Sequence, residues 1–214
     1  MTDQVLYIDG EASFYSSDDR EKIAEIIENI ETLTADYLQD INAESVADIT
    51  QQQYIGLLSY IAMKYIRPSK IMYKHIQGSS HEGNISFMYN DNLLDLLSRY
   101  YIYISSKYNK IANPFGFCTL IGSDVDAINR WEKQQDQRPR AYGTAKRLRK
   151  AYETGLENGA QSGKNPVGFI ATLNHRFGWS ADNKPALTVN ITRNQDQILQ
   201  SFDSSLITEK PATP

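Results

Sequence analysis

Basic and amide side chains are concentrated between Asn129 and Lys150, and their types suit contact with nucleic acid. Arginine and lysine bind phosphates, whereas asparagine, glutamine and arginine can also hydrogen-bond to base edges. Taken alone, such a cluster is equally typical of a solvated helix face. The candidate DNA-binding residues are Asn129, Arg130, Lys133, Gln134, Arg138, Arg140, Lys146, Arg147, Arg149 and Lys150.

Other chemistries find little support in the residue pattern. His75 and His81 are six residues apart, but no cysteine or carboxylate pattern completes a metal site around them. The run GAQSGKN follows an expected helix rather than a strand, and it has Asn165 where a phosphate-binding loop needs Ser or Thr. No nucleophile and orienting carboxylate accompany His175. We therefore expect no catalytic residue, no metal and no cofactor, and a protein that is not an enzyme.

Charge is distributed unevenly along the 214 residues. The net charge is −4, but Met1–Tyr60 holds 13 Asp/Glu and 2 Lys/Arg, which gives −11. Arg130–Arg176 holds 10 Lys/Arg and 4 Asp/Glu, which gives +6. Because distribution matters more than the total for nucleic-acid binding, the basic part remains a candidate for DNA contact. The acidic part is expected to have a different partner.

The composition is that of a soluble protein, with 41% hydrophobic and 22% charged residues. Cys118 is the single cysteine, so no intramolecular disulfide is possible. No apolar run approaches the roughly 18 residues of a membrane span, and the acidic start lacks the features of a signal peptide. We expect a cytoplasmic protein without a membrane partner.

Two helices are predicted in an acidic region over residues 1–68. The first begins at Asp18 and repeats apolar residues at a helical period from Ile23 to Tyr37. The second covers 49–66 and ends near Arg67-Pro68. Self-association or binding of a partner protein is the expected role. Residues 69–90 are expected to form a connector, either a hairpin or an irregular loop.

A helix-turn-helix domain is predicted over residues 91–136. An amphipathic helix near 92–111 leads to Asn113-Pro114, which has the residue types of a helix start. Gly122 suits the turn, and Ser123 or Asp124 can cap a second helix over 124–134. The residues expected to share a core between the two helices are Phe117, Cys118, Ile121, Ile128 and Trp131.

Two features argue against DNA reading by this second helix. Ser123 stands where such motifs usually have an aliphatic residue, and Val125 is expected to pack in its place. Asp124 and Asp126 lie where base-contacting residues usually sit, and carboxylates repel phosphate. A helical hairpin that only packs therefore remains an alternative.

Residues 137–192 are predicted to hold a basic helix, a further helix and a short strand. Arg138 and Arg140 are expected in a loop, before a helix from Lys146 to about Gly159. A second Asn-Pro pair opens a helix over 166–177, and Ala186–Thr192 alternates like a strand. Residues 193–214 are expected to be a flexible tail. The predicted fold class is mainly α, with a helical N-terminal region, a central helix-turn-helix, further helices and a short C-terminal strand.

The run YIYISSKYNKIANPFGFCTLIGSDVDAINRWEK, followed by a basic helix and NPVGFIATLNHRFGW, resembles the small terminase subunits of tailed bacteriophages. The resemblance covers residues 91–179. It implies a non-enzymatic, ring-forming homo-oligomer in the host cytoplasm. Such a subunit binds double-stranded DNA at the viral packaging site and delivers it to the large terminase subunit, an ATPase-nuclease.

The resemblance also implies roles for particular residues. Asn129, Arg130 and Lys133 would lie on the reading helix, with Arg147, Arg149 and Lys150 near phosphates. In many family members the DNA-binding domain comes first, whereas about 90 residues precede it here. Two other functions remain open: a phage or plasmid transcriptional or replication regulator that binds DNA as a dimer, and a structural or interaction protein of a viral assembly.

Overall fold

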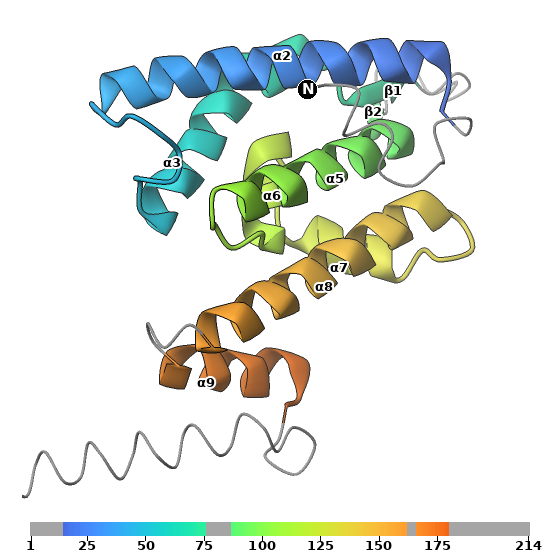
Figure 1. Ribbon diagram of the computed structural model, residues 1–214. Helices are drawn as coiled ribbons and strands as arrows, with labels where there is room; N and C mark the ends of the chain where they lie inside the picture. The colour runs from blue at the N-terminus through green and yellow to red at the C-terminus, as the bar shows by residue number, and fades with distance from the viewer. Residues whose placement is uncertain (1–14, 76–86, 162–165, 180–214) are drawn as a thin grey trace, which may run out of the picture. The chain divides into compact units, whose positions relative to one another are not determined.

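The computed structural model describes residues 15–75, 87–161 and 166–179. The chain divides into two compact units, Met1–Tyr152 and Glu153–Pro214. The described residues are mainly helical, with a short two-stranded sheet, which confirms the predicted mainly-α class (Figure 1). The strand expected at 186–192 and the tail expected at 193–214 lie outside the described residues.

The first unit begins with α2 (Ser17–Asp40), a long amphipathic helix. The Ser16 hydroxyl caps it by accepting a hydrogen bond from the Asp19 amide at 3.1 Å. Its isoleucines at the helical period are buried, while most of its acidic side chains are exposed. This buried stripe packs on α3 (Gln51–Ile61) and on α5 (Asp91–Lys107), which lie beneath α2 in Figure 1. The first predicted helix is confirmed.

The helix that begins with α3 does not stay α-helical to its end. It widens into a π-helical turn, Ala62–Ile66, and closes with α4 (Arg67–Ser69). Pro68 has no N–H to donate to the carbonyl four residues earlier, which favours an altered turn at this point. The chain leaves the helix at Lys70, whose φ of 53° is left-handed. The predicted end near Arg67-Pro68 is therefore close to the observed one.

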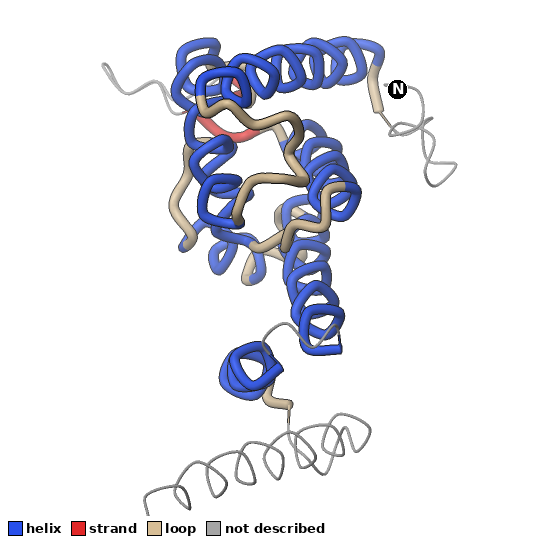
Figure 2. The backbone as a smooth tube through the Cα atoms, turned by 60° about the vertical axis from the view of Figure 1, so that its left-hand side comes forward, coloured by secondary structure: helices blue, strands red, loops and turns tan. Residues whose placement is uncertain are grey.

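Two short strands follow, β1 (Tyr73–His75) and β2 (Phe87–Tyr89). They pair antiparallel with Tyr73 opposite Tyr89, and the two tyrosine rings stack with centroids 4.7 Å apart. The sequence predicts either a hairpin or an irregular loop for the connector. The paired strands, red in Figure 2, confirm the hairpin for its two described ends. The residues that join them, 76–86, lie outside the described residues.

The start of α2 is bonded to the start of α5. The Asp19 carboxylate accepts hydrogen bonds from the Asn90 amide group at 2.9 Å and from the Asn92 amide group at 2.7 Å. Burial alone would raise the pKa of Asp19, but these bonds and one from Ser16 lower it below its usual value. The two helix starts are therefore held together by a buried, fully bonded carboxylate.

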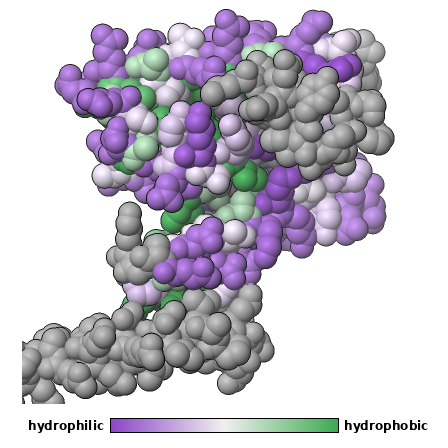
Figure 3. Space-filling model, in the orientation of Figure 1, coloured by the Kyte–Doolittle hydropathy of each residue, from purple (hydrophilic) through white to green (hydrophobic). Residues whose placement is uncertain are grey.

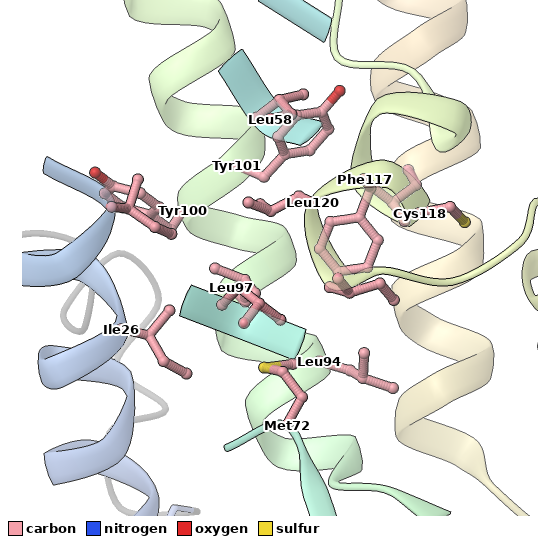
Figure 4. Packing of buried hydrophobic residues seen from close by; sticks show 14 of the residues in the cluster. Ile26, Leu58, Met72, Leu94, Leu97, Tyr100, Tyr101, Phe117, Cys118 and Leu120 are labelled. Carbon is pink, nitrogen blue, oxygen red and sulfur yellow. The ribbon is translucent and has the colours of Figure 1, made fainter. Parts of the chain in front are cut away.

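Helix α5 is the centre of the first unit. Figure 4 shows its side chains Leu94, Leu97 and Tyr101 packed between α2 and the helix that carries Phe117. The predicted amphipathic helix is confirmed, but it ends at Lys107 rather than near 111. Asn109 then adopts a left-handed φ of 53°, which turns the chain away from the helix.

Asp95 of α5 forms the most connected buried ion pair among the described residues. Its side chain is 7% exposed and accepts hydrogen bonds from Arg147 at 2.7 Å, from Arg99 at 3.1 Å and from the Tyr15 hydroxyl. Burial alone would raise the pKa of Asp95, but Tyr15 and the two guanidinium groups lower it below its usual value. One carboxylate thus joins the chain before α2, α5 and α8 (Pro139–Gln161).

Helix α8 begins earlier than predicted, at Pro139, so the expectation that Arg140 lies in a loop is wrong. Proline suits a first helical position, and the fixed φ of Pro139 allows the helix to start there. Within the first unit α8 buries a stripe of small and apolar residues against the core. These residues are Ala141, Ala145 and Leu148.

The second unit contains the end of α8 and α9 (Pro166–Phe177), whose bounds agree with the prediction. A Cβ on Gly159 would lie 2.8 Å from the Phe169 ring, so glycine permits this close approach. Gly178 leaves α9 with a φ of +67°, and the Trp179 indole N–H donates to Glu153 at 2.8 Å. Trp179 therefore links the end of α9 to Glu153 of α8 within this unit.

The Asp95→Asn variant tests the buried ion pair. Removing one partner of a buried pair costs roughly 3–5 kcal/mol. The Arg147 side chain is 31% exposed, so we expect a smaller loss of about 2 kcal/mol in the free energy of unfolding. Urea unfolding measures it, with Asp36→Asn, on the exposed face of α2, as the control. Equal stability of the two variants would contradict this role.

Acid unfolding provides a separate test of the same carboxylate. Because the folded-state pKa of Asp95 is lowered, its stabilisation is present above the unfolded pKa of about 4 and disappears as the pH falls through the folded value. Between pH 5 and about pH 2, the free energy of unfolding should therefore fall further for the wild type than for Asp95→Asn. Parallel stability curves for the two proteins would contradict the lowered pKa.

Candidate nucleic-acid interface

The candidate interface starts at the entry into α6 (Pro114–Ile121). The Asn113 side chain caps α6 by accepting a hydrogen bond from the Gly116 amide at 2.6 Å. The Tyr101 hydroxyl of α5 lies 3.2 Å from both the backbone nitrogen and the backbone oxygen of Asn113. A Cβ on Gly116 would overlap this hydroxyl, so glycine is required for α6 to pack on α5.

A tight turn joins α6 to α7 (Asp126–Glu132). Gly122 has a φ of +71°, and the Ser123 amide donates to the Cys118 carbonyl at 2.8 Å, which completes a Schellman motif. The Asp124 carboxylate then accepts a bond from the Ala127 amide at 2.9 Å. The residue at the N-cap position of α7 is Val125, which makes no capping bond. Asp124, one of the two predicted alternatives, supplies the side-chain acceptor for the first turn instead.

The second helix is shorter than the predicted 124–134. At its end the amides of Lys133 and Gln134 bond three residues back, to Arg130 and Trp131, instead of four. Such bonds tighten the last turn into a 3₁₀ geometry and end the α-helix. The exposed reading surface of α7 is therefore about two turns long.

The core of the helical hairpin is the predicted one. Its residues are all at most 3% exposed and are Phe117, Cys118, Ile121, Ile128 and Trp131. Burial raises the pKa of the Cys118 thiol to about 12, so the thiol stays protonated and acts as a small apolar group. The expectation that Val125 packs in place of Ser123 is wrong, because Val125 is 39% exposed. The tight turn directs Val125 outward, and Ile128 fills the space between the helices.

Sequence reasoning missed Arg67 as a residue of this region. A Cβ on Gly122 would lie 2.6 Å from the Arg67 Nε atom, so this guanidinium covers the turn between α6 and α7. Arg67 is exposed, and a cation beside the turn suits phosphate contact. The Arg67-Pro68 pair indicated only a helix end. Nothing in the spacing of residues 67 and 122 signals their contact.

Four of the candidate arginines pair with carboxylates of the protein itself: Arg130 locally with Asp124, and three others with carboxylates of other helices. Arg138 bonds to Asp91 through two nitrogen atoms, with Nε at 3.2 Å, and Arg147 bonds to Asp95. Arg149 bonds to Glu132 of α7 and, at 2.9 Å, to the Asn129 side chain. The last three guanidinium groups connect helices, and they offer fewer donors to DNA than isolated surface arginines would.

Arg149 of α8 bonds to Glu132 and Asn129 of α7, and on this basis the exposed cations of α8 and those on or just after α7 are grouped as one candidate surface. We call this surface the basic face; it comprises Arg130, Lys133, Lys146 and Lys150. Arg130 is paired with Asp124 at 3.4 Å, but both side chains are well exposed, so the pair is weak. The Lys146 ammonium lies 5.5 Å from the Tyr142 ring centroid.

Arg140 and Gln134 are less exposed than the basic face, and Asn129 is exposed but hydrogen-bonded within the protein. The Arg140 guanidinium lies 4.8 Å from the centroid of the Tyr15 ring. The Gln134 side-chain oxygen is buried and has no hydrogen-bond partner among the described residues. Asn129 is exposed, but its amide group donates to Asp126 at 3.4 Å and its oxygen accepts from Arg149. Neither Arg140 nor Gln134 extends toward solvent as freely as Lys133.

Gly122→Ala tests the turn that orients α7. Alanine at a left-handed φ costs roughly 1–2 kcal/mol, and it also meets the Arg67 side chain. We expect a loss of at least 1 kcal/mol in the free energy of unfolding, partly recovered when Arg67→Ala is added. Gly143→Ala is the matched control: nothing lies within 4 Å of its Cβ, and a helical alanine should stabilise by about 1 kcal/mol. Equal effects at the two glycines would contradict the proposed turn.

Within the ranges 15–75, 87–161 and 166–179, no group of three or more His, Cys, Asp or Glu side chains could hold a metal ion. None of the helices in those ranges is long and apolar enough to cross a membrane. His175 lies in the last turn of α9, and the side chains of His75 and His81 lie outside the described residues. Comparisons of the chain with protein-family models, curated proteins and solved structures give no match.

Proposed function

We propose that the protein is a non-enzymatic viral DNA-packaging adaptor. It binds double-stranded packaging-site DNA through the α6–α7 hairpin and delivers that DNA to a large terminase subunit as a ring-shaped homo-oligomer. The observation that carries the DNA-binding part is the hairpin itself: a capped support helix, a Schellman turn at Gly122 and a second helix with a buried apolar side and a polar exposed side. This is the arrangement that a helix-turn-helix uses to place its second helix in the major groove.

The basic face supports this proposal because it lies on the hairpin's second helix and on the helix beside it. Lysines at Lys133, Lys146 and Lys150 can contact phosphates on either side of the groove that α7 enters. The aspartates that oppose DNA reading are partly engaged in local bonds. Asp124 bonds to the Ala127 amide and pairs with Arg130, and Asp126 bonds to Asn129.

The packaging role and the ring rest on the resemblance of residues 91–179 to small terminase subunits. The dimeric regulator uses the same DNA-binding surface, so oligomeric state separates the two functions. Light scattering on the chromatographed protein should give about eight or more subunits for the packaging adaptor. A stable dimer that still binds DNA would favour the regulator.

Salt-dependent DNA binding tests the surface itself. Each phosphate contact contributes about 0.9 to the slope of log affinity against log salt. Changing Lys133, Lys146 and Lys150 together to alanine should therefore reduce the slope by about 2–3 and weaken binding to all sequences. Fluorescence anisotropy with labelled duplex DNA over a salt series measures both effects.

The matched control is the triple alanine variant of Lys22, Lys64 and Lys107, which removes the same charge from the N-terminal helices and from α5. It should leave the slope unchanged. Arg147 is unsuitable for this test because its removal breaks the ion pair with Asp95. Absence of binding at low salt, or equal slopes for the two triple variants, would contradict DNA binding by this face.

A further inference from the structure

A pocket of about 320 Å³ opens between α2, the α2–α3 connection and α5 in the first unit. Its size lies at the lower end of the range for small-molecule sites. Aliphatic side chains from all three segments form its apolar wall, among them Ile27, Leu38, Val46 and Ile104. The DNA-binding proposal makes no use of this pocket.

A buried hydroxyl without a partner lies in the wall of the pocket. Tyr100 is 4% exposed, and its hydroxyl group has no hydrogen-bond partner among the described residues. Figure 4 shows Tyr100 on the side of α5 that faces α2. The residue also lines a second, small void of about 10 Å³, which shares Val46 and Ile104 with the pocket. Buried polar groups are normally satisfied, so a ligand atom is a natural partner for this hydroxyl.

The charged side chains that line the pocket are Glu31, Glu44 and Lys107, so its lining carries one net negative charge. Glu31 and Glu44 line it, and both carboxylates are on exposed residues at its edge. The surface over α2 is largely hydrophilic in Figure 3, as expected for a helix rich in exposed acids. Burial and the nearby Glu31 both raise the pKa of Tyr100, so its hydroxyl stays neutral beside these carboxylates.

The tyrosine rings add a second attraction for a cation. Tyr100, Tyr103 and Tyr108 all line the pocket, and the face of an aromatic ring carries negative charge density. Tyr108 already binds one cation, because the Lys107 ammonium lies 5.1 Å from its ring centroid. Several tyrosines with nearby carboxylates and an apolar wall form the kind of site that recognises organic ammonium groups.

We propose that this pocket binds a small organic cation with an apolar body, such as an arylalkylammonium ion. The ammonium group lies between the tyrosine rings and the carboxylates of Glu31 and Glu44, and the apolar body rests against the aliphatic wall. An ammonium N–H of the ligand donates a hydrogen bond to the Tyr100 hydroxyl oxygen. This site is independent of the DNA-binding surface.

Methyl NMR on the full-length protein tests the site. Phenethyltrimethylammonium is the probe, and 3-phenylpropanoate is a matched anion of similar size. We expect the cation to shift the methyl signals of Val46, Ile27 and Ile104 saturably, with an affinity at least tenfold higher than that of the anion. Equal affinities, or no saturable shift up to millimolar concentrations, would overturn the proposal.

Variants then separate charge from packing. The double variant Glu31→Gln with Glu44→Gln should weaken cation binding, and Tyr103→Leu should weaken it roughly 3- to 30-fold through the lost ring contact. Glu21→Gln with Glu28→Gln removes the same charge from exposed positions of α2 outside the pocket, and it should leave the affinity within about twofold. Circular dichroism melting confirms that each variant is folded. Equal weakening by the two glutamine pairs would show general charge attraction and overturn the site.

A second copy of the chain is the competing occupant. Ala35→Arg places a long side chain in the pocket and should abolish probe binding without changing the oligomeric state. If this variant instead dissociates the oligomer, the pocket is an interface between copies and the small-cation proposal is wrong. Tyr100→Phe, which keeps the ring and removes the hydroxyl, should weaken phenethylammonium, which has N–H donors, more than it weakens phenethyltrimethylammonium, which has none.

Discussion

The buried carboxylate of Asp95 constrains the first unit more than any other described side chain. It requires compensation for its charge, and it obtains this from two arginines and a tyrosine hydroxyl that come from separate parts of the chain. Arg147 on α8 can pair with Asp95 only if α8 lies along α5. The position of α8 then determines where Arg149 bonds to α7, and so how the helical hairpin and the basic helix are placed side by side.

This network changes the meaning of the uneven charge distribution. The sequence shows an acidic part and a basic part, and the simplest hypothesis is that each binds a different partner. In the structure, part of the basic charge is used internally, since Arg138, Arg147 and Arg149 pair with Asp91, Asp95 and Glu132. The lysines of the basic face are exposed, and they are the side chains proposed to contact nucleic acid. Glu31 of α2 and Glu44 of the following connection line the pocket proposed for a cation.

Local features of the fold were predictable because their physical causes are local. The Asn-Pro pair marks the start of α6, Pro166 is the first residue of α9, and Gly122 takes the left-handed turn that an L side chain resists. The amphipathic period of α5 fixes its buried side. The buried residues of the hairpin follow from the same reasoning.

Long-range features could not be predicted in this way. Asp95 and Arg147 are 52 residues apart, and nothing in a single sequence identifies them as partners. The same holds for Arg67 beside Gly122 and for the tyrosines around the pocket. Pro139 allowed an earlier start for α8, but the cluster of arginines around it also fitted a loop. The sequence alone does not distinguish a basic side chain that binds DNA from one that pairs with a buried carboxylate.

Lysine footprinting tests the central claim, DNA contact through the basic face, most directly. The protein is acetylated with and without duplex DNA at low salt, and modification of each lysine is quantified by mass spectrometry. The account predicts that DNA protects Lys133, Lys146 and Lys150, while Lys22, Lys64 and Lys107 are modified equally in both samples. Protection of the second set, or no difference at the first set while DNA is bound, would contradict it.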